Sequence, residues 1–214
     1  MDLEKLCVST AEPTFNAIIG LLDKYDFVEI RIDHADLSDD EIRQIFSQPK
    51  TLIATCREGR YNRSERLARL EIAIEAGASY VDVETEADDE FIDRISCVAE
   101  KHDCKLIVSY HNFDNTPAGA CLRAVADKCI SQGADLVKLV TASHGETDNA
   151  RILSLYSDYD NITAFAMGRL GRITRIASIY AGAPYTYVSV SGKPVADGQL
   201  SFDEMVEIIS KIRD

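Results

Sequence analysis

The strongest constraint on the fold is a strict alternation that runs along the whole chain. Short apolar and β-branched runs, typical of buried strands, alternate with amphipathic stretches of about ten to fifteen residues that are typical of helices. The expected strands are 6–10, 27–32, 51–56, 80–84, 105–111, 135–140, 161–167 and 186–190. The expected helices are 15–24, 39–46, 64–76, 89–101, 119–132, 149–156, 173–180 and 202–212. This order predicts an α/β protein with a parallel sheet.

Eight such units average about 27 residues each, close to the minimum for a strand, a covering helix and two loops. We therefore predict a single (β/α)8 barrel, the TIM-barrel fold, that spans residues 1–214 as one domain. The alternative is an open doubly wound sheet, which would use fewer strands and often a glycine-rich first turn. The first turn here, residues 9–13, has no glycine. The longest irregular stretch, residues 191–200, predicts a mobile loop over one end of the barrel.

The charge of the chain argues against several classes of partner. Lys and Arg number 23 against 36 Asp and Glu, a net charge of -13, which disfavours nucleic acids and anionic membranes as partners. No apolar run approaches the ~20 residues that span a bilayer, and the first residues lack the pattern of a secretory signal. These features predict a cytoplasmic protein.

The cysteines and histidines show no local metal motif. The six cysteines contain no CxxC pair and read as reduced thiols, and the four histidines are widely scattered. We predict no metal, although a ligand set gathered from distant segments stays open.

Charged and other polar groups interrupt strands that should be almost wholly apolar in a parallel barrel. Because side chains alternate along a strand, these groups share one face, which we expect to point into the barrel. They are Glu29, Arg31, Thr55, Arg57, Asp82, Glu84, Ser109, His111 and Lys138. Several lie near the carboxyl ends of their strands, where barrel enzymes assemble their sites. The pattern predicts an active site there, and a structural ion-pair network is the alternative.

Lys138, in the segment ADLVKLV, is the strongest single candidate for a catalytic residue. Its apolar neighbours favour an uncharged amine, which can attack a carbonyl and form a Schiff base. The alternative is a lysine neutralised by a buried carboxylate such as Glu84. His111 ends the preceding strand and is the natural proton carrier, although it could instead bond only a backbone carbonyl.

Three arginines are candidates for binding a small anionic ligand. Arg31, Arg57 and Arg175 can each donate paired hydrogen bonds to a carboxylate. In the segment GRLGRITR, Arg169 and Arg172 are equally available, and all three arginines of this segment could be solvated instead.

Several short motifs carry a family resemblance from end to end. They are Glu29-Ile30-Arg31-Ile32-Asp33, Thr55-Cys56-Arg57, Val81-Asp82-Val83-Glu84, Ser109-Tyr110-His111-Asn112-Phe113, Thr116-Pro117, Asp135-Leu136-Val137-Lys138, Met167-Gly168, Gly171, Thr174-Arg175 and Gly198-Gln199. With them the chain resembles the type I 3-dehydroquinate dehydratases, the Schiff-base enzymes of the shikimate pathway. The resemblance implies a catalytic TIM barrel, a hydro-lyase of chorismate and aromatic amino-acid biosynthesis, that uses no cofactor and forms a homodimer.

The resemblance also implies roles for individual residues. Lys138 would form an imine with the ketone of 3-dehydroquinate, and His111 would take a proton from the adjacent carbon and then protonate the departing hydroxyl. Glu58 would orient His111, with Glu84 in reserve. The residues implied to bind the substrate are Glu29, Arg31, Arg57, Arg175 and Gln199, the last from a loop that covers the substrate.

The sequence departs from the family pattern in two places. Arg57, Glu58 and Gly59 are contiguous here, whereas the family usually has several residues between the arginine and the Glu-Gly pair. The family commonly has Ser or Thr four residues before the loop glutamine, where this chain has Val195, and Ser191 or Lys193 could replace that hydroxyl.

Two other functions remain open on the residues alone. A class I aldolase or transaldolase also needs a barrel lysine, but it usually binds a phosphorylated sugar, and the segments MGRLGR and SVSGKP match a phosphate cradle only weakly. A non-catalytic barrel that binds a shikimate-pathway metabolite would not need both the lysine and the histidine.

Overall fold

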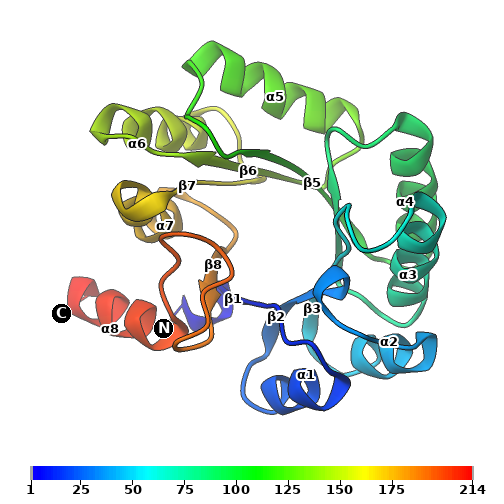
Figure 1. Cartoon of the computed structure of the whole chain (residues 1–214). Coiled ribbons are helices and arrows are strands. Elements are labelled where there is room, and N and C mark those ends of the chain that lie inside the picture. Colours follow the sequence, from blue (N-terminus) through cyan, green and yellow to red (C-terminus); the bar gives the residue numbers. More distant parts are fainter. Residues whose placement is uncertain (1, 214) are drawn as a thin grey trace.

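A computed structural model describes residues 2–213 of the chain. Its eight strands form one parallel sheet that curves into a barrel, and α-helices surround the barrel (Figure 1). The strands are β1 (Leu6–Thr10), β2 (Phe27–Arg31), β3 (Thr51–Thr55), β4 (Tyr80–Glu84), β5 (Lys105–Asn112), β6 (Leu136–Ala142), β7 (Ile162–Met167) and β8 (Thr186–Ser189). The helices are α1 (Phe15–Leu22), α2 (Asp39–Phe46), α3 (Arg63–Glu75), α4 (Asp89–Lys101), α5 (Gly119–Ser131), α6 (Glu146–Leu153), α7 (Gly168–Ala181) and α8 (Phe202–Arg213). The predicted (β/α)8 barrel is confirmed.

The strands follow the order β7-β6-β5-β4-β3-β2-β1-β8 around the barrel. Within the described residues, no backbone ladder joins β7 to β8. The hydroxyl of Thr163 on β7 instead donates to the backbone carbonyl of Tyr185, just before β8, at 3.1 Å. A side-chain hydrogen bond therefore crosses the seam where the ladder is missing.

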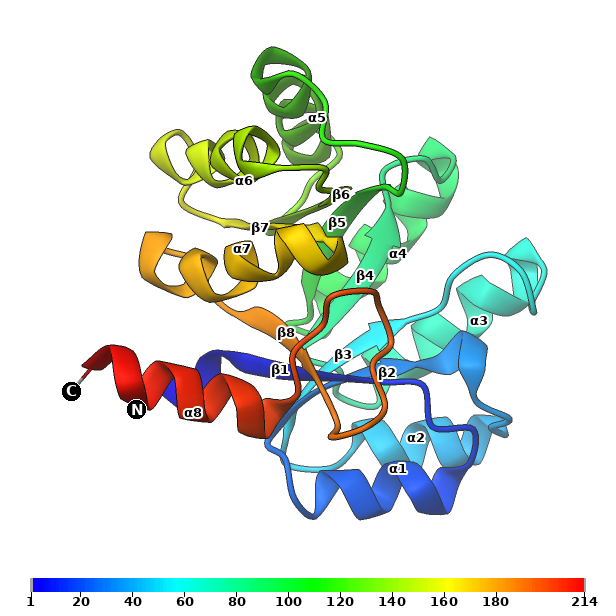
Figure 2. The ribbon, with the colours of Figure 1, turned by 60° about the vertical axis from the view of Figure 1, so that its left-hand side comes forward.

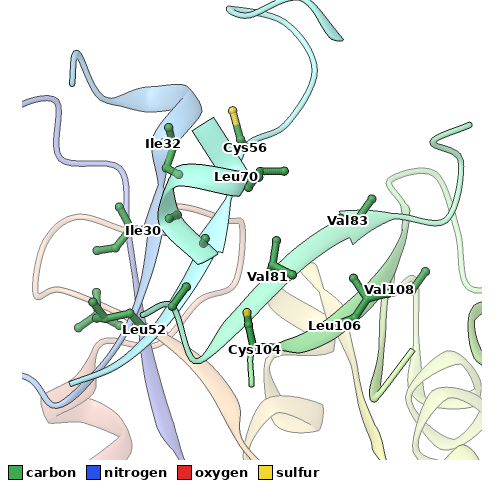
Figure 3. Close-up of a cluster of buried hydrophobic side chains, with 14 of the residues drawn as sticks. Ile30, Ile32, Leu52, Cys56, Leu70, Val81, Val83, Cys104, Leu106 and Val108 are labelled. Carbon is green, nitrogen blue, oxygen red and sulfur yellow. The ribbon is translucent and has the colours of Figure 1, made fainter. Parts of the chain in front are cut away.

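Alternating side chains of the strands serve two separate cores. One set points outward and packs against the helices, and Figure 3 shows part of it, with Leu70 of α3 beside Cys56, just after β3, and with Val81 and Val83 along β4. The other set fills the inside of the barrel, where the rings of Phe27, Tyr80 and Tyr185 lie with centroids 4.9 to 6.2 Å apart. This aromatic layer closes the barrel below the polar residues.

Local side-chain chemistry fixes where several helices begin. Ser38 accepts a hydrogen bond from the backbone of Glu41, whose carboxylate accepts one from the backbone of Ser38, and Asn62 and Glu65 form the same capping box at α3. Both boxes satisfy backbone donors that a helix start leaves free.

Two helices begin earlier than the sequence predicts. Helix α7 starts at Gly168, not at residue 173, because Gly168 has a φ of 83° and turns the chain directly from β7 into the helix. In the sequence alone, Gly168 and Gly171 indicate a loop and not the first turn of a helix. Helix α6 starts at Glu146, not at residue 149, and the Asp148 side chain accepts a hydrogen bond from the backbone of His144 before it.

None of the helices in residues 2–213 combines the length and apolar character needed to cross a membrane.

Gly171 allows helix α7 to lie directly against strand β7. A Cβ at this position would sit 2.6 Å from the carbonyl oxygen of Ala166. We expect Gly171→Ala to lower the free energy of unfolding by about 1–3 kcal/mol, the usual cost of overpacking. Urea unfolding followed by circular dichroism measures this change.

Gly20 is the matched control, because it is an exposed helical glycine with no atom within 4 Å of an added Cβ. Gly20→Ala should raise the free energy of unfolding by about 0.5–1 kcal/mol. Equal stability of Gly171→Ala and the unmodified protein would contradict the close approach.

Candidate active site

Strand β6 carries the Lys138 side chain into the barrel, where the residue is only 5% exposed. Its Nζ lies 2.8 Å from Oδ2 of Asp82 and 3.4 Å from Oε1 of Glu29, and 4.3 Å from the centre of the Tyr187 ring. The Lys138 nitrogen therefore lies against buried carboxylates, which is the alternative that the sequence left open. Its nearest carboxylate belongs to Asp82, two residues before Glu84 on the same face of β4.

Asp82 is the functional residue that the sequence analysis placed on the polar face but gave no role. One of its oxygens contacts Lys138, and the other accepts hydrogen bonds from Arg57 (2.7 Å) and Ser109 (2.7 Å). Burial alone would raise the pKa of Asp82, but the charges of Arg57 and Lys138 lower it well below its usual range. The carboxylate is therefore ionised throughout the neutral range.

Glu29 is held in place from both sides. The hydroxyl of Ser9 donates to its Oε2, and the hydroxyl of Thr55 donates to its Oε1 at 3.1 Å. Both donors come from neighbouring strands, so the carboxylate that faces Lys138 has a fixed orientation.

His111 lies half-buried near the carboxyl end of β5, stacked on Phe113 with ring centroids 6.0 Å apart and planes 13° apart. Burial is the first cause that lowers its pKa well below 6.5, and the positive charges of Arg57 and Lys138 lower it further. The imidazole is therefore neutral at pH 7 and has a nitrogen able to accept a proton.

A cavity of about 560 Å³ opens above the Lys138–Asp82 pair at the carboxyl ends of the strands. The eight residues to which the family resemblance gives a catalytic or binding role all line it. They are Glu29, Arg31, Arg57, Glu58, His111, Lys138, Arg175 and Gln199. The prediction that the polar strand faces converge at this end of the barrel is confirmed. The interior is thus an ion-pair network with room for a small molecule beside it.

Arg175 is the arginine that the structure selects from the segment GRLGRITR. It is 1% exposed and its guanidinium lies 4.3 Å from the centre of the Phe165 ring, whereas Arg169 and Arg172 are exposed. Burial lowers the pKa of Arg175 to about 10. Among the described residues its buried Nε finds no hydrogen-bond partner. A buried donor of this kind favours an incoming anion.

The other two arginines are already partnered. Arg31 donates to Asp33 through Nε at 3.0 Å and Nη2 at 2.6 Å. Arg57 contacts Asp82, Ser109 and Glu84. These contacts fix the directions in which both guanidiniums face the cavity.

The loop between β8 and α8 covers one side of the cavity, and Figure 2 shows it beside the start of α7. The backbone N–H of Gly168 donates to the carbonyl of Asp197 at 3.3 Å, and a Cβ on Gly198 would meet the Gly168 carbonyl oxygen at 2.3 Å. Gln199 accepts hydrogen bonds from the backbone of Val195 (2.8 Å) and Ala196 (3.3 Å), so it shapes the loop while it lines the cavity.

Neither proposed substitute for the loop hydroxyl lines this cavity. Ser191 is exposed, and Lys193 pairs instead with Glu12, with 2.5 Å between Nζ and Oε1.

The structure corrects the assignment of Glu58 as the residue that orients His111. The Glu58 side chain is 83% exposed and its Oε1 pairs with Nη1 of Arg66 at 3.1 Å. Glu84, the reserve candidate, lies between Arg57 (3.3 Å) and Arg66 (3.0 Å). Both carboxylates contact Arg66 of α3, and neither hydrogen-bonds His111.

The comparisons with known proteins agree with this geometry. A model of the family described as type I 3-dehydroquinase matches residues 6–213. The chain belongs to the type I 3-dehydroquinase family. The predicted resemblance is therefore confirmed, and the aldolase, transaldolase and non-catalytic alternatives are set aside.

Named relatives cover almost the whole chain. A 3-dehydroquinate dehydratase from Pyrococcus abyssi is 37% identical over 195 residues, 87% of each chain. The enzyme of the same name from Methanocaldococcus jannaschii is 33% identical and covers 95% of this chain and 96% of its own. The crystal structure of the type I enzyme from Clostridium difficile, with covalently modified comenic acid, superposes with a TM-score of 0.86 at 23% identity, over 97% of this chain and 91% of its own, and shows the shared fold.

Metal-ligating side chains do not gather in the described part of the chain: residues 2–213 contain no group of three or more His, Cys, Asp or Glu arranged to hold an ion.

Proposed function

We propose that this chain converts 3-dehydroquinate to 3-dehydroshikimate and water, a hydro-lyase step of the shikimate pathway toward chorismate and the aromatic amino acids. The observation that carries the proposal is one cavity in which the Lys138 amine and a neutral His111 lie together under buried Arg175. Membership of the type I 3-dehydroquinase family supports it.

The first step joins Lys138 to the ketone of the substrate. The ammonium and the carbonyl condense to an iminium ion and one water, so that the single positive charge is conserved. Asp82 and Glu29 lie within 3.4 Å of the nitrogen and stabilise that charge before and after the bond forms.

His111 performs the proton transfers of the elimination. Its free nitrogen takes a proton from the carbon next to the iminium carbon, and the electron pair moves into the iminium to give an enamine. The enamine then expels the hydroxyl, which leaves as water after it receives that same proton from His111. One water hydrolyses the resulting iminium, releases 3-dehydroshikimate and restores the Lys138 ammonium.

The remaining lining residues bind and orient the ring. Arg175 pairs with the substrate carboxylate, because its buried guanidinium offers an unused donor. Glu29, Arg31, Arg57 and Gln199 bind the hydroxyls and the rest of the ring, and no cofactor takes part. We also propose that residues 1–214 act as one catalytic domain in the cytoplasm, a setting that suits six free cysteines.

Reduction with borohydride in the presence of 3-dehydroquinate should attach one substrate-derived unit to Lys138, because the reagent reduces the imine to a stable amine. Mass spectrometry of the intact protein and of its peptides measures the adduct. Lys138→Ala should form none. Lys193→Ala is the matched control, since Lys193 pairs with Glu12 outside this cavity, and it should form the adduct normally. An active protein without an adduct on Lys138 would refute the mechanism.

His111→Ala should still form the imine but turn over more slowly by a factor of about 100 or more, because proton transfer is its main role. Steady-state assays together with borohydride trapping separate the two steps. His144→Ala, a change in an exposed histidine outside the cavity, should behave like the unmodified enzyme. Loss of imine formation with continued elimination would show that the roles are reversed.

We propose that the enzyme is a homodimer that pairs through α7. Leu170, Ile173 and Tyr180 are 55%, 54% and 48% exposed and lie on the same side of that helix. Light scattering should give twice the chain mass of 23.7 kDa, and Ile173→Glu should give a monomer that is still folded. A monomeric unmodified protein would rule out this interface.

A further inference from the structure

Arg66 is a buried cation that the proposed reaction does not use. It lies on α3, outside the barrel, is 4% exposed, and does not line the cavity. Its Nε donates to the backbone carbonyl of Cys56 at 2.9 Å, and its other nitrogens contact Glu58 (3.1 Å) and Glu84 (3.0 Å). Its guanidinium also lies 5.1 Å from the centre of the Phe91 ring. Four groups outside α3 therefore fix the position of this side chain.

A chain of alternating charges leads from Arg66 to the reactive amine. Glu84 uses Oε2 for Arg66 (3.0 Å) and Oε1 for Arg57 (3.3 Å). Arg57 then contacts Oδ1 of Asp82 at 2.7 Å, and Oδ2 of Asp82 contacts Nζ of Lys138 at 2.8 Å. Each carboxylate in this chain is shared between two cations, so a change in one contact alters the next.

We propose that Arg66 is a positioning residue for Lys138, acting through Glu84, Arg57 and Asp82. This inference rests on the proposed function, because it concerns the rate at which Lys138 forms its imine. Arg66 holds one oxygen of Glu84 and so leaves a single oxygen for Arg57. Arg57 keeps its second amino group on Asp82, which divides the charge of Asp82 between two cations.

Removal of the Arg66 charge frees both oxygens of Glu84 for Arg57. The guanidinium of Arg57 is then drawn toward Glu84, and Asp82 is left with Lys138 as its main cation. A tighter Asp82–Lys138 pair holds the ammonium more firmly. Imine formation needs that ammonium to give up protons, so it slows, whereas Arg31, Arg175 and Gln199 lie outside this chain of charges and still bind the substrate.

The test compares Arg66→Met, which keeps the length but not the charge, with Arg66→Lys, which keeps the charge. The rate of adduct formation on Lys138 is measured with saturating 3-dehydroquinate and borohydride quenching, alongside kcat and KM. Arg66→Met should lower the adduct rate and kcat by about tenfold, as expected for a residue that acts through a packed network, with KM nearly unchanged. Arg66→Lys should recover most of the rate.

Arg63→Met is the matched control. Arg63 lies on the same helix and pairs with Asp88 (2.7 Å) and Glu90 (3.1 Å) at the surface, away from the chain of charges. It should leave the adduct rate unchanged. Circular dichroism establishes that each variant is folded.

A folded Arg66→Met protein with the unmodified adduct rate would overturn the inference, and so would a change confined to KM. If Arg66→Met does not fold, Glu84→Gln tests the same connection from the next position. It removes the carboxylate that draws Arg57 away from Asp82, so Arg57 should share more of the Asp82 charge and the adduct should form faster than in the unmodified enzyme; a slower or unchanged rate would overturn the inference. Absence of any Lys138 adduct in the unmodified enzyme would instead refute the proposed function itself.

Discussion

The buried ammonium of Lys138 requires a negative partner inside the barrel, and the polar interior is arranged around that requirement. An isolated charge at this depth would cost several kcal/mol, and the loss of one member of a buried pair typically costs about 3–5 kcal/mol. Asp82 meets the requirement directly and Glu29 completes it. Each of these carboxylates is in turn held by other groups, so the arrangement draws on the six strands β1 to β6 and does not depend on one contact.

The charges of this network are balanced although the whole protein carries a net charge of -13. Three cations, Lys138, Arg57 and Arg66, face three buried or half-buried carboxylates, Asp82, Glu29 and Glu84. The exposed carboxylate of Glu58 also contacts Arg66, at the edge of this network. Arg175 stands outside this balance, since within residues 2–213 it forms no salt bridge. It therefore offers an anionic substrate a positive charge that no carboxylate of the described residues already holds, in a protein whose net charge is negative.

Much of this arrangement could be predicted from the sequence, because strand periodicity decides which side chains face inward. Alternation placed Lys138 and His111 on the inner face, and the position of a strand end placed Arg57 at the rim. Periodicity does not give the depth of one strand relative to the next, which is why Asp82 received no role and Glu84 was considered as the partner of Lys138. The sheet register does not supply that information either, because it pairs Ser109 with both Glu84 and Lys138; the contact of the Lys138 amine with Asp82 decides the partner.

Other features depended on contacts between segments that are far apart in the chain. The glycines near the start of α7 read as a loop, but the helix packs so closely on β7 that it needs one of them. Glu58 follows Arg57 directly, and nothing local indicates that Arg66 will draw its carboxylate away from His111. The choice of Arg175 over Arg169 and Arg172 was likewise set by which side of α7 meets the barrel.

The two cores described above use opposite sides of the same strands. Val137 and Leu139 pack in the core between the strands and the helices, whereas Lys138 between them faces the cavity. Neighbouring residues of one strand therefore have different requirements: volume and apolar character outside, chemical reactivity inside. An outward-facing residue can be replaced by another of similar volume without a change in the side chains that face the cavity. Conversely, an inward-facing residue can be replaced without a change in the packing between strands and helices. Along each strand the barrel thus alternates residues that stabilise the fold with residues that are available for the reaction.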